Sequence, residues 1–338
     1  MIKLNKNESY WLLNEALVDA AHSSSWETLS TYPDYTALKE ELALYAGVTP
    51  EMILVTPGSD AGIEHIVRTY SKVRERCVLP VPTFYGYESI LERAGVELIP
   101  VPYKNEQNNF IFPCNETLET LPGAKILFLC NPNNPLGSVI PEDDLTRILD
   151  AARTHSVLVV SDEAYFEFSG QTLVPLLNEY ENLIIVRTLS KGFGLSGARI
   201  GYTIASSTRI AEMMHDMLPW PVAHQSVSAA CALLGRNEEV CRRVELVKAE
   251  RVRFEQELRT LPQIVVYPSE ANFVLVRVPN AKEVQRALAD ADIQVALGEP
   301  MSRFADAKTL LKDTIRIAIP SPEDRPKVTA VLKVLLTG

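Results

Sequence analysis

The chain has 338 residues, of which 46% are hydrophobic and 22% are charged, and its formal net charge is −10 at pH 7. Such a composition is typical of a globular protein with about two domains, and it lacks both the basic blocks of a nucleic-acid-binding protein and the ~20-residue apolar run of a membrane span. The five cysteines are scattered without CxxC spacing and the amino terminus has no apolar signal core, so we expect a cytoplasmic protein without a metal site or disulfides.

Residues 1–35 are predicted to form an arm rather than a domain. They contain Asn5 and Asn7, an aromatic pair at 10–11 and a hydroxyl-rich stretch that reads HSSSWETLSTYPDY. Helical periodicity then appears over residues 36–47 and marks the beginning of the folded body.

From there, short apolar runs alternate with amphipathic segments. The amphipathic segments indicate helices at 62–72, 87–93 and 142–154. The apolar runs predict seven strands, at 53–56, 77–81, 97–101, 126–130, 157–161, 183–187 and 199–205. Because such apolar strands are buried on both sides and helices lie between them, we expect a large α/β domain over residues 36–235, with a mostly parallel sheet covered by helices.

The character of the chain changes near residue 236. A long charged amphipathic helix is predicted over 237–261. It is followed by strand-like runs at 264–267, 271–278 and 314–319 and by helical patterns at 282–290 and 326–336. We therefore expect a smaller α+β domain over residues 236–338.

Ligands of open α/β sheets bind beyond the carboxyl ends of the strands, so the loops that follow the predicted strands are the places to search. After 53–56, Ser59 and Asp60 precede a helix whose backbone N–H groups can bind a phosphate, although either residue can equally be a simple helix cap. After 77–81, Phe84, Tyr85 and Tyr87 can stack on a heteroaromatic ring or belong to the core.

The next two loops carry amide and carboxylate groups. In NPNNPLG, Asn134 can offer its amide to a ligand, and turn formation is the alternative explanation of this motif. In SDEAYFEF, Asp162 and Glu163 end a buried strand, where a carboxylate is costly without a cationic partner. A pyridinium nitrogen is one such partner for Asp162, with Tyr165 near the ring; an Asp that caps a turn is the alternative.

The stretch VRTLSKGFGLSGARIGY places an amine, hydroxyls and a cation on one glycine-rich turn. Lys191 can form a Schiff base with an aldehyde cofactor, while Thr188, Ser190 and Arg199 can hold its phosphate. Alone, Lys191 is better explained as a solvated residue, as most loop lysines are. Together, the five loops supply every contact that a phosphorylated pyridine aldehyde requires.

Eight segments that carry these residues stand in a characteristic order: YPDYTALKEELA, PGSD, PTFYGY, CNPNNPLG, DEAYFEF, RTLSKGFGLSGARIGY, ANF and IRIAI. With them the chain resembles the fold-type I pyridoxal-phosphate enzymes of aminotransferase class I/II, and within these the histidinol-phosphate aminotransferase subgroup. It departs from the family pattern at Leu136, where the family has Thr, and at Pro320 and Ser321, where the family has Gly-Thr. The resemblance implies the cofactor pyridoxal 5′-phosphate and a homodimer with shared active sites.

The resemblance also implies roles for individual residues. Lys191 would form the aldimine with the cofactor and carry the proton, Asp162 would pair with the ring nitrogen, and Phe84 would stack on the ring. Asn134 and Tyr165 would bond the phenolic oxygen of the ring. The phosphate would be held by Ser59, Asp60, Thr188, Ser190 and Arg199.

For the substrate, the resemblance points to Arg316 as the ligand of an α-carboxylate, with Asn7 and Asn134 nearby. Tyr32 would reach the cofactor and substrate of the partner subunit. Arg303 stands 13 residues before Arg316, a distance that suits a second arginine for a substrate phosphate. A solvated loop residue is the alternative, because the apolar lead-in expected in the family is missing.

The predicted activity is transfer of an amino group between an amino acid or histidinol-phosphate-like amino-alcohol phosphate and a 2-oxo acid. A decarboxylase, lyase or cyclase on the same scaffold, similar to threonine-phosphate decarboxylase, is the alternative reaction. A ligand-sensing regulator of the same fold is a third reading, disfavoured because residues 1–35 are too few for an added DNA-binding domain. No nucleic acid or membrane partner is expected.

Overall fold

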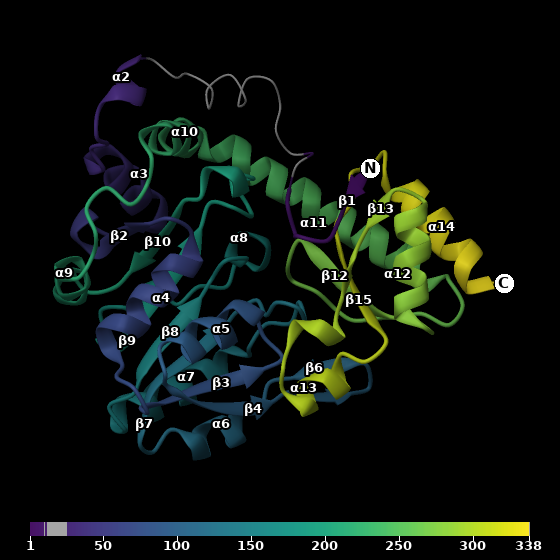
Figure 1. Cartoon of the computed structure of the whole chain (residues 1–338), viewed down its shortest axis with the longest axis horizontal. Coiled ribbons are helices and arrows are strands. Elements are labelled where there is room, and N and C mark those ends of the chain that lie inside the picture. Colours follow the sequence, from purple (N-terminus) through teal and green to yellow (C-terminus); the bar gives the residue numbers. More distant parts are fainter. Residues whose placement is uncertain (10, 12–25, 338) are drawn as a thin grey trace.

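The computed structural model describes residues 1–9, 11 and 26–337 (Figure 1). The predicted arm therefore lies partly outside the described residues, at position 10 and over 12–25. Within residues 26–35, α2 (Trp26–Ser30) is helical. None of the helices in the described part of the chain is long and apolar enough to cross a membrane.

The larger body of the protein is built on a seven-stranded sheet. Its strands, in spatial order, are β2 (Ile53–Thr56), β10 (Gly201–Ile204), β9 (Leu183–Thr188), β8 (Leu158–Asp162), β7 (Ala124–Cys130), β3 (Arg76–Val81) and β4 (Glu97–Pro102). All run in one direction except β10, which is antiparallel to both of its neighbours. The prediction of a mostly parallel seven-stranded sheet is thus confirmed.

Both faces of this sheet are covered, as the apolar strands predicted. Leu127 and Leu129 of β7 face one core and Ile126 and Phe128 face the other, because side chains alternate along a strand. The first core is closed by α3 (Thr36–Ala46), α6 (Cys114–Thr120), α7 (Glu142–Thr154) and α10 (His224–Leu234). The second is closed by α4 (Ser59–Tyr70), α5 (Tyr85–Arg93) and α9 (Ser207–His215).

The carboxyl-terminal third forms a second sheet with its own core. Its four antiparallel strands are, in spatial order, β11 (Val265–Val266), β12 (Phe273–Arg277), β15 (Thr314–Ala318) and β14 (Ala296–Leu297). The helices α11 (Asn237–Arg259), α12 (Ala281–Asp290) and α14 (Arg325–Thr337) pack on it through a cluster that includes Phe254, Leu288 and Leu332. In Figure 1, α11 runs from the large sheet to this second sheet. The domain boundaries at 35 and 235 stay predictions.

The smaller elements complete the fold. They are a hairpin of β5 (Lys104–Glu106) and β6 (Asn109–Ile111), the short helices α8 (Phe166–Ser169) and α13 (Ala305–Leu310), and a parallel pair of β1 (Ile2–Lys3) with β13 (Ile293–Gln294).

The amino-terminal residues after β1 join the two bodies. The carbonyl of Leu4 accepts a hydrogen bond from the N–H of Ala318, and the N–H of Leu4 donates to Gln294. Residues 5–9, which we call the N-terminal segment, continue from there to the carboxyl edge of the large sheet. This arrangement places the asparagines of the predicted arm beside the strand-end loops.

Candidate active site

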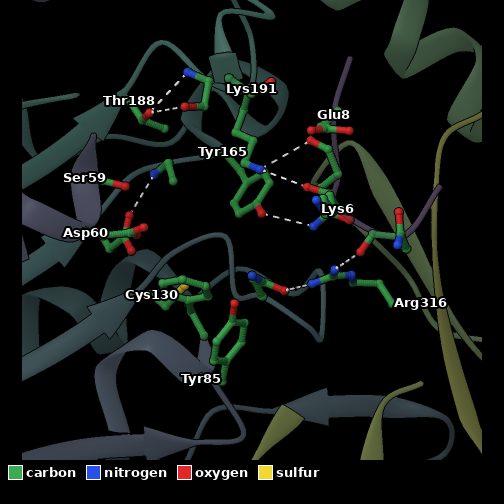
Figure 2. Close-up of a pocket in the computed structure, with 18 of the residues that line it drawn as sticks. Lys6, Glu8, Ser59, Asp60, Tyr85, Cys130, Tyr165, Thr188, Lys191 and Arg316 are labelled. Carbon is green, nitrogen blue, oxygen red and sulfur yellow. Dashed lines mark hydrogen bonds between the residues drawn. The ribbon is translucent and has the colours of Figure 1, made fainter. Parts of the chain in front are cut away.

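A cavity of about 340 Å³ lies at the carboxyl edge of the large sheet, between it and the second sheet. Every residue predicted for the site except Tyr32 and Arg303 lines it (Figure 2). Sequence reasoning did not single out five other lining residues: Lys6, Glu8, Cys130, Ala164 and Ser196. Each stands one or a few positions from a predicted residue, so proximity along the chain was the available signal.

The strand directions explain why these residues meet. The parallel strands β2, β3, β7, β8 and β9 end at one edge and deliver their following loops there. Because β10 runs the other way, Arg199, just before its first residue, reaches the same edge. The predicted strand at 199–205 began too early, since Arg199 has a left-handed φ of 52° and β10 starts at Gly201.

One end of the cavity is suited to a phosphate. Helix α4 starts at Ser59 with Gly58 as its N-cap, and no side chain caps its first N–H groups. Ser59 and Asp60 are thus in the first turn and are not the cap, which leaves the helix terminus open to an anion. The guanidinium of Arg199 lies beside it: a Cβ at Gly58 would stand 2.6 Å from Nη2.

Two hydroxyls complete this end of the cavity. The Thr188 and Ser190 oxygens are 2.9 Å apart, and the Ser190 N–H donates to Thr188 Oγ1 at 3.1 Å. The start of β10 packs closely against the start of α4 at this end of the cavity, because a Cβ at Gly201 would stand 2.3 Å from the Gly58 carbonyl carbon. Backbone N–H groups, hydroxyls and an arginine are the donors that a phosphate monoester requires.

The two carboxylates that end β8 have opposite surroundings. Glu163 is buried and fully paired: Arg187 donates to it from Nε at 3.0 Å and Nη2 at 2.8 Å, and Thr172 and the Leu173 N–H add two more bonds. Asp162 is equally buried but, among the described residues, no basic side chain lies within ion-pairing distance of it. Glu163 is therefore a structural residue and Asp162 faces the cavity.

Asp162 is held by two neutral donors. The Tyr87 hydroxyl donates to Oδ2 at 2.7 Å and the Ala164 N–H donates to Oδ1 at 3.1 Å. The second bond is the turn predicted as the alternative reading, while the pairing of Asp162 with a pyridinium nitrogen stays a prediction. Burial raises the pKa of Asp162 to about 6. A buried carboxylate with no cation beside a cavity fits a pyridinium nitrogen, which would supply the missing positive charge.

Lys191 points into the cavity toward the N-terminal segment (Figure 2). Its Nζ donates to the carbonyls of Lys6 at 3.2 Å and Asn7 at 3.4 Å. Burial, followed by the charge of Arg316, lowers the pKa of Lys191 to about 8. The amine lies 5.7 Å from the centre of the Tyr165 ring. An amine with a lowered pKa is a better nucleophile and proton carrier near neutral pH than a solvated lysine.

The N-terminal segment also fixes Tyr165. Asn7 has a left-handed φ of 55°, a conformation that asparagine tolerates, and its Nδ2 donates to the Tyr165 hydroxyl at 3.0 Å. The Asn7 carbonyl accepts from the buried Asn272 at 3.1 Å, and Asn272 also donates to Ser9 at 3.2 Å. Asn272 belongs to the ANF motif, which thereby gains a structural role.

Arg316 lies on the opposite side of the cavity from Ser59 and Asp60 (Figure 2). Its guanidinium donates to Asn134 Oδ1 and to the carbonyl of Asn5. The buried Nε has no partner among the described residues. Burial lowers the pKa of Arg316, and a buried guanidinium with a spare donor is suited to an anionic group.

Phe84 borders the cavity beside Tyr85. A Cβ at Gly86 would stand 2.3 Å from the Phe84 ring, so a side chain at position 86 would displace the aromatic. The ring is half-buried, and its edge meets Tyr87 with centroids 6.1 Å apart. The predicted stacking surface is therefore present at the cavity wall.

Tyr32 and Arg303 lie elsewhere. Tyr32 is 75% exposed and stacks on Trp220 with ring centroids 4.2 Å apart. Arg303 bonds Glu92 at 2.7 Å through Nη1, and its Nε lies 3.6 Å from Glu88. Arg303 therefore ties the segment after β14 to α5. Here Arg303 pairs with two carboxylates and does not line the cavity, and its role as a substrate ligand stays a prediction.

Comparison with known proteins gives a consistent result. The family model described as aminotransferase class I and II matches residues 1–332. A histidinol-phosphate aminotransferase of Ruminiclostridium cellulolyticum is 36% identical over 329 residues, which cover 95% of this chain and 89% of that protein. Another, of Caldanaerobacter subterraneus, is 37% identical over 312 residues, which cover 91% of this chain and 85% of that protein.

Solved structures have the same fold. The histidinol-phosphate aminotransferase of Sinorhizobium meliloti, in complex with pyridoxal-5′-phosphate, matches with a TM-score of 0.85 and 24% identity, covering 99% of this chain and 90% of that one. The L-threonine-O-3-phosphate decarboxylase of Porphyromonas gingivalis matches with a TM-score of 0.83 and 21% identity over the full length of both chains. At these identities the likeness shows the fold alone.

Proposed function

The chain belongs to the class I and II aminotransferase family, and on this basis we propose that it moves an amino group between an amino-alcohol phosphate of the histidinol phosphate type and a 2-oxo acid. It is an aminotransferase that depends on pyridoxal 5′-phosphate. The observation that carries the proposal is that one cavity is lined both by Asp162, a buried carboxylate without a cation, and by Lys191, an amine with a lowered pKa.

The bound cofactor supplies an aldehyde that links to amines and a protonated ring that accepts electrons. For this we assign Arg199, Thr188, Ser190 and the N–H groups of Ser59 and Asp60 to its phosphate, Phe84 to stacking on the ring, and Asn134 and Tyr165 to its phenolic oxygen. Asp162 would keep the ring nitrogen protonated, because a neutral ring would accept electrons poorly.

Lys191 performs the proton transfer. Its amine would accept, at Nζ, the proton lost by the substrate carbon that bears the nitrogen, and would later release it again. A pKa of about 8 lets the group release and take up a proton at neutral pH. The hydrogen bond from Asn7 to Tyr165 keeps the phenol beside the amine throughout.

We assign the anionic end of both substrates to Arg316. Among the described residues that line the cavity, the cations are Lys6, Lys191, Arg199 and Arg316. A bound cofactor would engage Lys191 and Arg199, so Arg316, with its unpartnered Nε, is the buried cation that remains for a carboxylate or a phosphate. Asn7 lies within reach of the same space.

A half-reaction tests the substrate. The yellow, cofactor-loaded protein is mixed with one amino donor at a time: histidinol phosphate, histidinol, glutamate or threonine phosphate. We expect histidinol phosphate and glutamate to bleach the lysine-bound cofactor and yield a carbonyl product. Release of carbon dioxide from threonine phosphate, without an oxo product, would identify the decarboxylase instead.

Two arginine variants sharpen the assignment. Arg316→Lys keeps a charge but loses the planar fork, so we expect KM for both histidinol phosphate and glutamate to rise at least about tenfold. Arg303→Ala is the matched control, because Arg303 bonds Glu88 and Glu92 and not the cavity. A selective rise of the histidinol phosphate KM in Arg303→Ala would restore Arg303 as the phosphate ligand.

We further propose a homodimer in which Tyr32 completes the partner's site. In support, the exposed Tyr32 stacks on the exposed Trp220, which together with the exposed Leu218 lines a cavity of about 510 Å³. Exposed apolar groups that gather in this way mark an interface. A cytoplasmic location stays a prediction.

Mixing two inactive variants tests the sharing of sites. In a hybrid of Lys191→Ala with Tyr32→Ala, one site receives an intact lysine from one subunit and an intact tyrosine from the other. We expect the mixture, after subunit exchange, to regain part of the wild-type activity. If Tyr32 serves its own subunit, the mixture stays as weak as the two parents.

A further inference from the structure

Tyr87 is a buried tyrosine that sequence reasoning left between a stacking and a core role. Its side chain is fully buried in α5, between Phe84 and Phe128, with ring centroids 6.1 and 5.2 Å away. Its hydroxyl donates to Asp162 Oδ2 at 2.7 Å, a distance typical of a strong bond to a carboxylate. The ring therefore belongs to the core, and the hydroxyl contacts Asp162 without lining the cavity itself.

The bond matters because Asp162 has few sources of stabilisation. Besides Tyr87, the described groups that influence its charge are the Ala164 N–H, Asp60 from α4, Glu163 directly after β8, Cys130 from β7 and Tyr165. Asp60 and Glu163 are acidic and favour the protonated form of Asp162. The two donors, Tyr87 and the Ala164 N–H, are what favour the charged form.

The two donors also orient the carboxylate. They bind opposite oxygens, Tyr87 at Oδ2 and Ala164 at Oδ1. Each carboxylate oxygen has two acceptor positions, so one remains free on each after these bonds form. The carboxylate cannot rotate without breaking a bond, and Asp162 lines the cavity.

We propose that Tyr87 is a positioning residue of the transamination reaction, which holds Asp162 charged and aimed at the pyridine nitrogen of the cofactor. The inference rests on the proposed function, because it assumes that Asp162 pairs with that nitrogen. Tyr87 itself touches neither cofactor nor substrate and acts through Asp162.

The test is cofactor binding by Tyr87→Phe, measured as the dissociation constant of pyridoxal phosphate over a range of pH. Tyr180→Phe is the matched control: Tyr180 is also buried and donates to an aspartate, Asp150, at 3.1 Å, but away from the cavity. Loss of a hydrogen bond to a charged group changes an equilibrium constant about 10- to 100-fold. We therefore expect the dissociation constant of pyridoxal phosphate to rise by that factor in Tyr87→Phe near neutral pH. Tyr180→Phe should bind like the wild type.

The pH dependence separates positioning from damage to the fold. Once the solution is alkaline enough to ionise Asp162 in both proteins, the deficit of Tyr87→Phe should shrink to the part that comes from the lost orientation of the carboxylate. A deficit that is the same at every pH would overturn the proposal, as would unchanged binding throughout. The same variant should also show the acidic limb of its kcat/KM profile displaced to higher pH.

A double-mutant cycle with Asp162→Asn distinguishes the inference from its premise. If Tyr87 acts through Asp162, adding Tyr87→Phe to Asp162→Asn should change the dissociation constant less than twofold, because neighbouring groups in one network are not additive. Asp162→Asn with wild-type binding would refute the role of Asp162 itself. Impaired Asp162→Asn with unimpaired Tyr87→Phe would refute the role of Tyr87 alone.

Discussion

Replacing Asp162 by Asn is predicted to stabilise the cofactor-free protein while it weakens the enzyme. The pKa of Asp162 lies at about 6 in the folded chain and at its ordinary value of 3.8 in the unfolded one, because burial penalises the charge. The difference between these two pKa values corresponds to about 3 kcal/mol in the free energy of unfolding. The wild-type protein carries this cost whenever Asp162 is ionised without a cofactor, and the neutral amide removes it.

The sign of the pH dependence follows from proton binding. Between the two pKa values the folded state binds more protons than the unfolded state, so wild-type stability falls as the pH rises through this window. The cost is fully present above the folded value. We therefore expect Asp162→Asn to exceed the wild type by up to about 3 kcal/mol at slightly alkaline pH, with the difference vanishing near the unfolded value.

Urea unfolding of both cofactor-free proteins at a series of pH values measures the effect. The amide keeps the shape of the side chain and can accept from the Ala164 N–H while it donates to Tyr87, so no cavity is introduced. With pyridoxal phosphate bound the order should reverse, since the variant loses the contact with the ring nitrogen. A variant less stable than the wild type at alkaline pH, in the absence of cofactor, would refute the reasoning.

Three further outcomes are expected. Glu163→Gln should lower the unfolding free energy by about 3–5 kcal/mol in the same urea experiment, because it leaves the buried Arg187 without its partner. In steady-state assays, Asn272→Ala should raise KM for both substrates about tenfold with a smaller change in kcat. The substitution removes the hydrogen bond by which Asn272 holds the Asn7 carbonyl. Lys191→Ala should abolish both turnover and the yellow colour of the bound cofactor; retained turnover would contradict its role.

The contrast between the two carboxylates of SDEAY shows where sequence reasoning stopped. Both were predicted to need a cation, because both end a buried strand. The two carboxylates differ in role because of Arg187, which stands 24 residues after Glu163 on the neighbouring strand β9 and forms an ion pair with Glu163 alone. Adjacent residues of a strand point to opposite faces, so which carboxylate meets the arginine follows from the register of the sheet.

The sequence by itself determined the large sheet and most of the cavity wall. Apolar strands alternating with helices require a covered parallel sheet, and such a sheet brings the loops of Ser59, Phe84, Asn134, Asp162 and Lys191 to one edge. Local patterns were sufficient because each of these residues ends its own strand or lies in the loop that begins there.

The tertiary structure alone decided the contacts between residues distant in the chain. Tyr87 meets Asp162 across 75 positions, Asn272 holds Asn7 across 265, and Arg303 turns from the cavity to Glu88. No periodicity or motif encodes such pairs, because they depend on how helices and sheets pack and not on the conformation of any one segment. The cavity could be placed from sequence, while its supporting hydrogen bonds could not.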